Sequence, residues 1–238
     1  MPKIHAIADL HLSLNADKPM HIFGSRWQGH TEKLRSRWCA LVEEEDTVVI
    51  PGDISWALSL PDAEADFRFI QSLPGKKLIG KGNHDFWWTS AAKMRKMFDS
   101  WGVTSVQFLH NNACRVQDKV ICGSRGWFIE EKLQNTVEPV DYEKLVNREC
   151  GRIDLSLTEG KKLADADSET LLFLHFPPVY GDFVCEPILD VLEKHGVTRC
   201  FHGHIHGNYT HPPKTEYRGI TFTMISADYL DFYPLRIG

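Results

Sequence analysis

The sequence has few of the features that would assign it to a specialised class of protein. Its six cysteines are scattered without a C-x-x-C pair, which excludes a structural zinc site of the cysteine type. No block of Lys or Arg occurs and the formal net charge is -5, so we do not expect a protein that binds extended nucleic acid by neutralising phosphates. No apolar run approaches the roughly 20 residues that cross a bilayer, so no membrane association is expected.

What remains is the composition of an ordinary globular protein. Hydrophobic residues make up 42% of the 238 residues and charged residues 25%, which allows a single domain over residues 1–238 to bury a full core. The first residues lack the layout of a signal peptide, because His5 and Asp9 interrupt the apolar run. Together with the unpaired cysteines, this predicts a protein of the reducing cytoplasm.

The first hundred residues repeat a unit of strand, polar loop and helix three times. The expected strands are 4–8, 47–50 and 77–79, and the expected helices are 31–45, 61–73 and 89–101. This alternation predicts an α/β fold in which polar loops gather at the carboxyl ends of the strands, where such sheets bind ligands.

From residue 103 onward the pattern changes to short β segments and two helices. Strands are expected at 103–108, 114–116, 120–122, 171–174, 197–201, 220–226 and 232–237, and helices at 141–164 and 187–195. The loop 13–30 and the segment 130–165 could each act as a lid or an interface, and the sequence leaves this open.

Metal-binding side chains follow five of the expected strands. They are Asp9 and His11, Asp53, Asn83 with His84, His175, and His204 with His206. Carboxylate, imidazole and amide ligands without thiolate suit manganese, iron or zinc. A carboxylate such as Asp53 has two oxygens and can bridge two metals about 3.5–4 Å apart. All of these side chains except His84 can therefore be sorted into two metal sites, whose net positive charge would attract a phosphate.

These blocks resemble the motifs of the calcineurin-like metallophosphoesterases. The family pattern is D-x-H, G-D, G-N-H-[DE], a lone His and G-H-x-H, and all five blocks stand here in order between residues 9 and 206. The resemblance implies a four-layer αββα double β-sandwich. It implies one divalent ion held by Asp9, His11, Asp53 and His206, and a second held by Asp53, Asn83, His175 and His204. It also implies that a metal-bridging hydroxide attacks phosphorus while His84 acts as the catalytic residue that protonates the leaving oxygen.

Three further segments resemble a bacterial subgroup labelled as serine/threonine phosphatase. They are Lys18–Met20, Ile22–Gly24 and Gly52–Ala57. Protein phosphatases of the superfamily carry G-D-x-x-D-R-G, but here Trp56 and Ala57 replace the second Asp and the Arg. The resemblance therefore implies phosphoester hydrolysis without implying a protein substrate.

The expected substrate is a small or nucleotide-like phosphoester. Trp56, Trp87 and Trp88 follow the metal-site loops and could form an apolar surface for a ring, while Arg125 could clamp a phosphate. Phosphodiesterase and phosphomonoesterase activity stay open, as does the oligomeric state. The alternative is a non-catalytic scaffold that keeps the fold, although this chain retains every expected ligand and His84.

Overall fold

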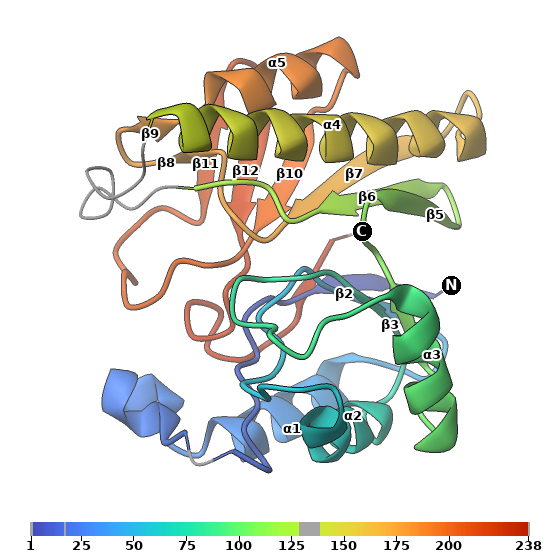
Figure 1. The fold of residues 1–238 in the computed structure, drawn as a ribbon, viewed down its shortest axis with the longest axis vertical. Helices are drawn as coiled ribbons and strands as arrows, with labels where there is room; N and C mark the ends of the chain where they lie inside the picture. The colour runs from blue at the N-terminus through green and yellow to red at the C-terminus, as the bar shows by residue number, and fades with distance from the viewer. Residues whose placement is uncertain (1, 17, 129–138, 238) are drawn as a thin grey trace. The chain divides into compact units, whose positions relative to one another are not determined.

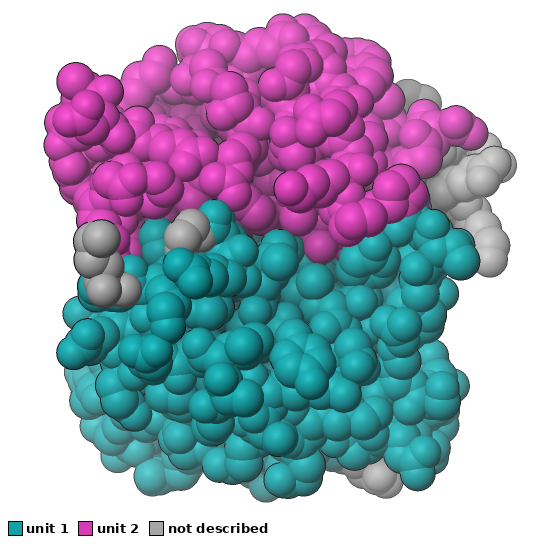
Figure 2. All heavy atoms as spheres, turned by 180° about the vertical axis from the view of Figure 1, so that it is seen from behind, with its two compact units in different colours: residues 1–108, 204–211, 225–238 teal, residues 109–203, 212–224 magenta. Residues whose placement is uncertain are grey.

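A computed structural model of the chain describes residues 2–16, 18–128 and 139–237. The chain divides into two compact units, coloured separately in Figure 2. Unit 1 comprises residues 1–108, 204–211 and 225–238, and unit 2 comprises residues 109–203 and 212–224. The single domain expected from the sequence stays a prediction, and each unit is described by itself.

Unit 1 contains a five-stranded sheet in the order β13-β1-β2-β3-β4. Its strands are β1 (Ile4–Ala6), β2 (Thr47–Ile50), β3 (Lys76–Ile79), β4 (Val106–Phe108) and β13 (Leu235–Arg236). β1 to β4 pair in parallel, and only the β13 edge is antiparallel. β1 and β2 are buried along their whole length, in keeping with the apolar residues that make up most of both strands.

Helices between these strands supply the core of unit 1. They are α1 (His30–Leu41), α2 (Glu64–Gln71) and α3 (Ala91–Ser100), with three short 3-10 turns, η1 (Met20–Phe23), η2 (Ser25–Trp27) and η3 (Pro61–Ala63). Trp38, Phe67 and Phe98 project from the three α-helices into one buried cluster. This packing fixes the direction in which β1, β2 and β3 present their carboxyl ends.

Unit 2 contains a six-stranded sheet in the order β11-β12-β10-β7-β6-β5. Its strands are β5 (Asn112–Val116), β6 (Lys119–Ser124), β7 (Glu169–Leu174), β10 (Arg199–His202), β11 (Lys214–Tyr217) and β12 (Ile220–Met224). The four central strands are parallel, and an antiparallel hairpin closes each edge. A separate hairpin joins β8 (Val179–Tyr180) to β9 (Phe183–Val184).

Two helices, α4 (Pro139–Leu163) and α5 (Glu186–Lys194), cover one face of this sheet (Figure 1). Ile153 and Leu157 of α4 join Leu189 of α5 in a second buried cluster. A Cβ at Gly160 would lie 2.5 Å from the sulfur of Cys122, so α4 approaches β6 more closely than a larger residue would allow. Among the described residues, no helix is both long and apolar enough to cross a bilayer.

The mixed α/β class is confirmed, and most expected elements are found within a few residues of their expected bounds. The expected strand 232–237 shortens to β13, because Asp231 and Phe232 take positive φ values of 49° and 61° and turn the chain first. The strand expected at 120–122 extends to Ser124 in β6. Residues 130–138 of the candidate lid 130–165 lie outside the described residues.

Candidate metal centre

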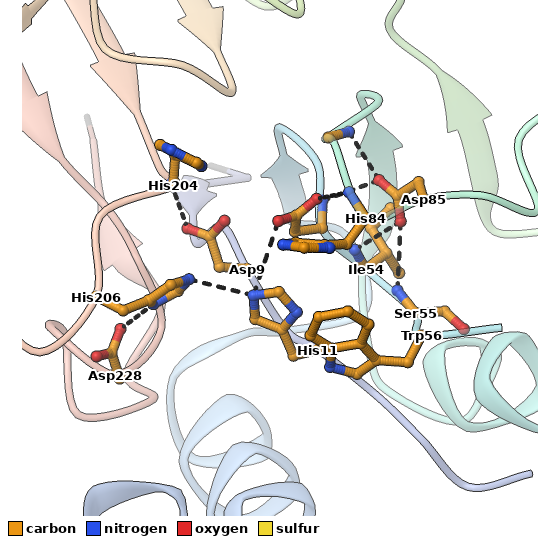
Figure 3. Close-up of polar contacts among 12 residues, drawn as sticks. Asp9, His11, Ile54, Ser55, Trp56, His84, Asp85, His204, His206 and Asp228 are labelled. Atoms are coloured by element: carbon orange, nitrogen blue, oxygen red, sulfur yellow. Dashed lines mark hydrogen bonds and ion pairs between the residues drawn. The ribbon is translucent and has the colours of Figure 1, made fainter. Parts of the chain in front are cut away.

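The parallel order of β1, β2 and β3 brings the polar loops of unit 1 together. Asp9 donates its backbone N–H to the carbonyl of Gly52 at 3.0 Å, and His11 donates to the carbonyl of Asp53 at 3.0 Å. The chain after β1 thus stays paired with the chain after β2 beyond the ends of both strands. His204 enters the same region from the C-terminal part of unit 1 and donates its N–H to Asp9 Oδ2 at 2.9 Å (Figure 3).

Five predicted ligands meet in this way within unit 1, and we refer to Asp9, His11, Asp53, His204 and His206 as the strand-end cluster. Ligand atoms of Asp9, His11 and His206 all lie within 4.8 Å of one another. The Nε2 atoms of His11 and His206 are 3.2 Å apart. Two nitrogens bound tetrahedrally to one ion at about 2.0–2.1 Å would be separated by roughly 3.3 Å, so this arrangement fits a divalent transition metal.

Asp53 lies where a carboxylate shared by two ions would be needed. Its Oδ2 is 3.8 Å from Nε2 of His11, and it also offers a ligand atom within 4.8 Å of one on His204. The ligand role of Asn83, whose side chain is half-buried in the next loop, stays a prediction. His175 follows β7 and belongs to unit 2, so its participation also stays a prediction.

The backbone of the strand-end cluster is strained. Asp9, His11, Asp53 and His204 have φ values of 60°, 45°, 50° and 72°, in the left-handed region that L-residues disfavour. Each such residue costs on the order of 1–3 kcal/mol unless its surroundings hold it in place, and strain of this kind concentrates at functional sites. The strain is therefore independent support for a functional site at the residues picked out by sequence.

Burial sets the electrostatics of the cluster. It raises the pKa of Asp9 to about 6. It also raises the pKa of Asp53 well above its usual value, with repulsion from Asp85 and Asp9 adding to the effect. The pKa of His11 is lowered well below its usual value by burial and by neighbouring imidazoles. A divalent cation would favour ionised carboxylates and neutral imidazoles together, so the donor set fits a metal.

Asp228 is a residue of this site that the motif analysis missed. Its Oδ1 is 2.7 Å from Nδ1 of His206, and its Oδ2 accepts hydrogen bonds from the N–H of Gly207 at 3.0 Å and the hydroxyl of Tyr209 at 3.1 Å. Burial acts to lower the pKa of His206, but this hydrogen bond and the charge of Asp9 outweigh it and raise the pKa. Asp228 thereby turns the other ring nitrogen of His206 toward His11 (Figure 3).

Asp85 joins the two loops that follow β2 and β3. Its fully buried carboxylate accepts backbone N–H groups from Asp53, Ile54 and Gly82 at 2.8–2.9 Å. It also accepts the N–H of Ser55 at 3.3 Å and the indole N–H of Trp87 at 3.0 Å. Asp85 stood in the expected motif, but its role as the anchor of these loops had not been predicted.

The loops approach too closely for any residue but glycine at position 82. A Cβ on Gly82 would lie 2.0 Å from Oδ1 of Asp53. The same oxygen accepts the backbone N–H of His84 at 2.8 Å. This contact fixes the predicted catalytic histidine beside the predicted bridging carboxylate.

The imidazole of His84 lies between the cluster and an aromatic side chain. Its ring centroid is 4.3 Å from that of Trp56 and 5.7 Å from that of His11. Burial lowers the pKa of His84, and the charges of His206 and Lys18 lower it further. The expectation that Trp87 contributes to an apolar ligand surface is wrong, because Trp87 is 1% exposed and donates its indole N–H to Asp85. Trp56 is half-buried and lies beside the site.

Arg125 lies in unit 2, next to His175. Its carbonyl accepts the N–H of His175 at 3.1 Å, and its guanidinium is 3.7 Å from the buried carboxylate of Glu149. Its role as a phosphate clamp stays a prediction.

Comparison with known families decides the assignment of the chain. The model of the calcineurin-like phosphoesterase family matches residues 2–208. The chain belongs to this family. The match spans every motif block from Asp9 to His206, whereas Asp228 lies outside it.

Solved structures show the same fold as this chain. A protein of unknown function from Aquifex aeolicus superposes with a TM-score of 0.51 at 15% identity, covering 99% of this chain and 96% of that one. The protein TT1561 of Thermus thermophilus superposes with a TM-score of 0.55 at 11% identity, covering 96% and 91%. Curated protein sequences give no match. At these identities the likeness extends to the fold alone.

Proposed function

We propose that this calcineurin-like phosphoesterase hydrolyses phosphoric esters with the help of two divalent transition-metal ions. The observation that carries the proposal is the strand-end cluster, in which ligand atoms of Asp9, His11 and His206 converge on a strained, buried backbone. The position of Asp53 beside both His11 and His204 supports a carboxylate shared between two ions.

In this proposal Asp9, His11, Asp53 and His206 hold one ion, and Asp53, Asn83, His175 and His204 hold the other. When bound, two such ions act as Lewis acids toward the phosphoryl group and activate water for in-line attack. Asp228 keeps His206 in the orientation that ligation requires. His84, held beside Asp53 through its backbone N–H, delivers a proton to the leaving oxygen.

The test is hydrolysis of bis-p-nitrophenyl phosphate and p-nitrophenyl phosphate by the same preparation, with manganese and with a chelator. We expect hydrolysis that the chelator abolishes and manganese restores, and the preferred ester separates phosphodiesterase from phosphomonoesterase activity. The metal content of the protein is measured in parallel. A protein that binds no metal and hydrolyses neither ester would overturn the proposal and favour a scaffold.

A further inference from the structure

An open cavity of about 450 Å³ lies in unit 1 among residues that follow β1, β2 and β3. Its apolar lining includes Trp56, Leu58 and Phe86, and its polar lining includes Lys18 and Asn15. None of these residues belongs to the five motif blocks.

The cavity adjoins the proposed metal centre through two aromatic side chains. The ring of Trp56 stacks on His11 at 5.0 Å between centroids with an interplanar angle of 23°, and it contacts His84 as described above (Figure 3). On the cavity side, the ring of Phe86 is 6.2 Å from that of His84. His84 therefore lies between the strand-end cluster and the cavity.

The apolar side chains of the cavity are left open to solvent. Phe86 is 58% exposed and Leu58 is 77% exposed. A ligand that covered both would remove this apolar surface from water. The cavity is thus suited to an uncharged, largely apolar group.

The lining of the cavity carries charges of both signs. The ammonium of Lys18 lies 4.2 Å from the centroid of the Trp56 ring, and its charge helps to lower the pKa of His84. The lining also includes Asp62 and Asp66, the latter buried and hydrogen-bonded to the N–H of Leu14 at 2.9 Å. These carboxyl groups would repel a phosphate, whereas Lys18 would attract one beside Trp56 and His84.

We propose that the cavity binds the alcohol portion of the phosphoester, and that this portion carries a planar aromatic ring of the nucleobase type. This inference rests on the proposed function, because it places the reacting phosphate at the strand-end cluster with Lys18 beside it. The ring then packs on Phe86 and Leu58, and the leaving oxygen falls next to His84. The cavity thereby selects among phosphoesters by the alcohol they release.

The test compares AMP with ribose 5-phosphate. In both compounds the leaving group is the primary 5-hydroxyl of ribose, and only AMP carries a base. The ratio of their kcat/KM values is measured with manganese, or on their methyl diesters if only diesters react. We expect AMP to be favoured on the order of tenfold, the scale of one base stacked on an aromatic side chain. Calorimetric binding of both compounds gives the same ratio without turnover.

Variants locate the source of this preference. Phe86→Ala and Leu58→Ala, both at exposed positions where folding should be kept, should bring the ratio close to one. Lys18→Met should lower kcat/KM for both compounds by the same factor, so that the ratio of AMP to ribose 5-phosphate stays the same. The control is Tyr233→Ala, which removes a 46% exposed aromatic side chain from a different cavity of unit 1.

Two results would overturn the inference: equal kcat/KM and equal binding of AMP and ribose 5-phosphate by the unaltered protein, or a preference that survives both cavity variants. Failure of the proposed function gives a different result from failure of this inference. In that case the nitrophenyl esters would not be hydrolysed either, while the ratio of the two binding affinities could still be measured.

Discussion

Left-handed backbone serves different purposes in the edge hairpins of unit 2 and at the strand ends of unit 1. In unit 2, Gln117 and Arg218 have φ values of 58° and 50°, and each lies in the turn of an exposed edge hairpin, between β5 and β6 or between β11 and β12. In unit 1, Asp9, His11 and Asp53 take similar values but are buried at strand ends. A strained residue in a hairpin turn serves chain reversal, whereas strain at a buried carboxylate or imidazole indicates a site.

The buried carboxylates Glu149 of unit 2 and Asp85 of unit 1 differ in the groups that bind them. Glu149 of unit 2 is held by arginine side chains, with Arg152 at 2.6 Å. Asp85 of unit 1 is held by backbone N–H groups of two loops. Side-chain partners can move away when a charge is removed, but backbone partners cannot move without shifting the loops themselves. The charge of Asp85 therefore helps to hold the loop that carries Asp53 of the strand-end cluster in position.

The strongest test of this comparison is Asp53→Asn. Removing a charge that both proposed ions share should lower metal-dependent hydrolysis by more than the ~100-fold typical of losing an outer partner of a ligand. The measurement is kcat/KM on the better nitrophenyl ester. Asp118→Asn, in the exposed turn of unit 2, serves as the control and should leave the rate as it was. An active Asp53→Asn protein would contradict the shared carboxylate.

The second test compares Asp85→Asn in unit 1 with Glu149→Gln in unit 2. Asp85→Asn should destabilise the folded protein and also weaken metal binding. The amide nitrogen would face N–H donors, and we expect a loss of about 2–4 kcal/mol in the free energy of unfolding together with weaker manganese binding. Urea unfolding and calorimetry provide the two values. Glu149→Gln in unit 2 should lower stability while manganese affinity is retained. Equal effects of both variants on metal affinity would remove the distinction drawn above.

Asp228→Asn should lower manganese affinity about 10- to 100-fold, because the amide no longer favours the ring orientation of His206. Tyr209→Phe removes only one of the hydrogen bonds to Asp228 and should have a smaller effect in the same direction. Both are measured by calorimetry at constant pH. Unchanged affinity in Asp228→Asn would show that His206 needs no such partner.

The smallest expected effect concerns two lysines, one in each sheet. Burial lowers the pKa of Lys77 in β3 to about 8, below its usual 10.5. The unfolded chain then binds more protons between these values, so this residue makes stability rise from pH 8 to 10.5, by about 1–3 kcal/mol. Chemical unfolding across this range should show the rise, and Lys77→Met should remove it.

Lys119 in β6 should behave in the opposite sense. Its hydrogen bond to Asp118 raises its pKa, so its contribution is present below pH 10.5 and is lost as pH passes the raised value. Lys119→Met is therefore the matched control, and a shared sign for the two lysines would refute the assignment.

Sequence reasoning identified the members of the strand-end cluster because strand ends and motif spacing are local properties. It also gave β2 within its observed bounds. It did not identify Asp228, which lies 22 residues from His206 and follows an expected strand without any motif. The same strand-end rule that selected Asp53 could have flagged it. The role of Asp85 and the strained φ values depend on how separate loops close on one another, which no local pattern records.

The order in which the chain visits unit 1 has a consequence for biosynthesis. Unit 1 is left at residue 108, re-entered at 204 with His204 and His206, and completed only after residue 225, which brings Asp228. A nascent chain that carries Asp9, His11 and Asp53 therefore lacks His204 and His206 until residues 109–203 have been synthesised. Ligand pairs this distant in sequence close late. The candidate metal-binding arrangement is thus complete only after Asp228 has been synthesised.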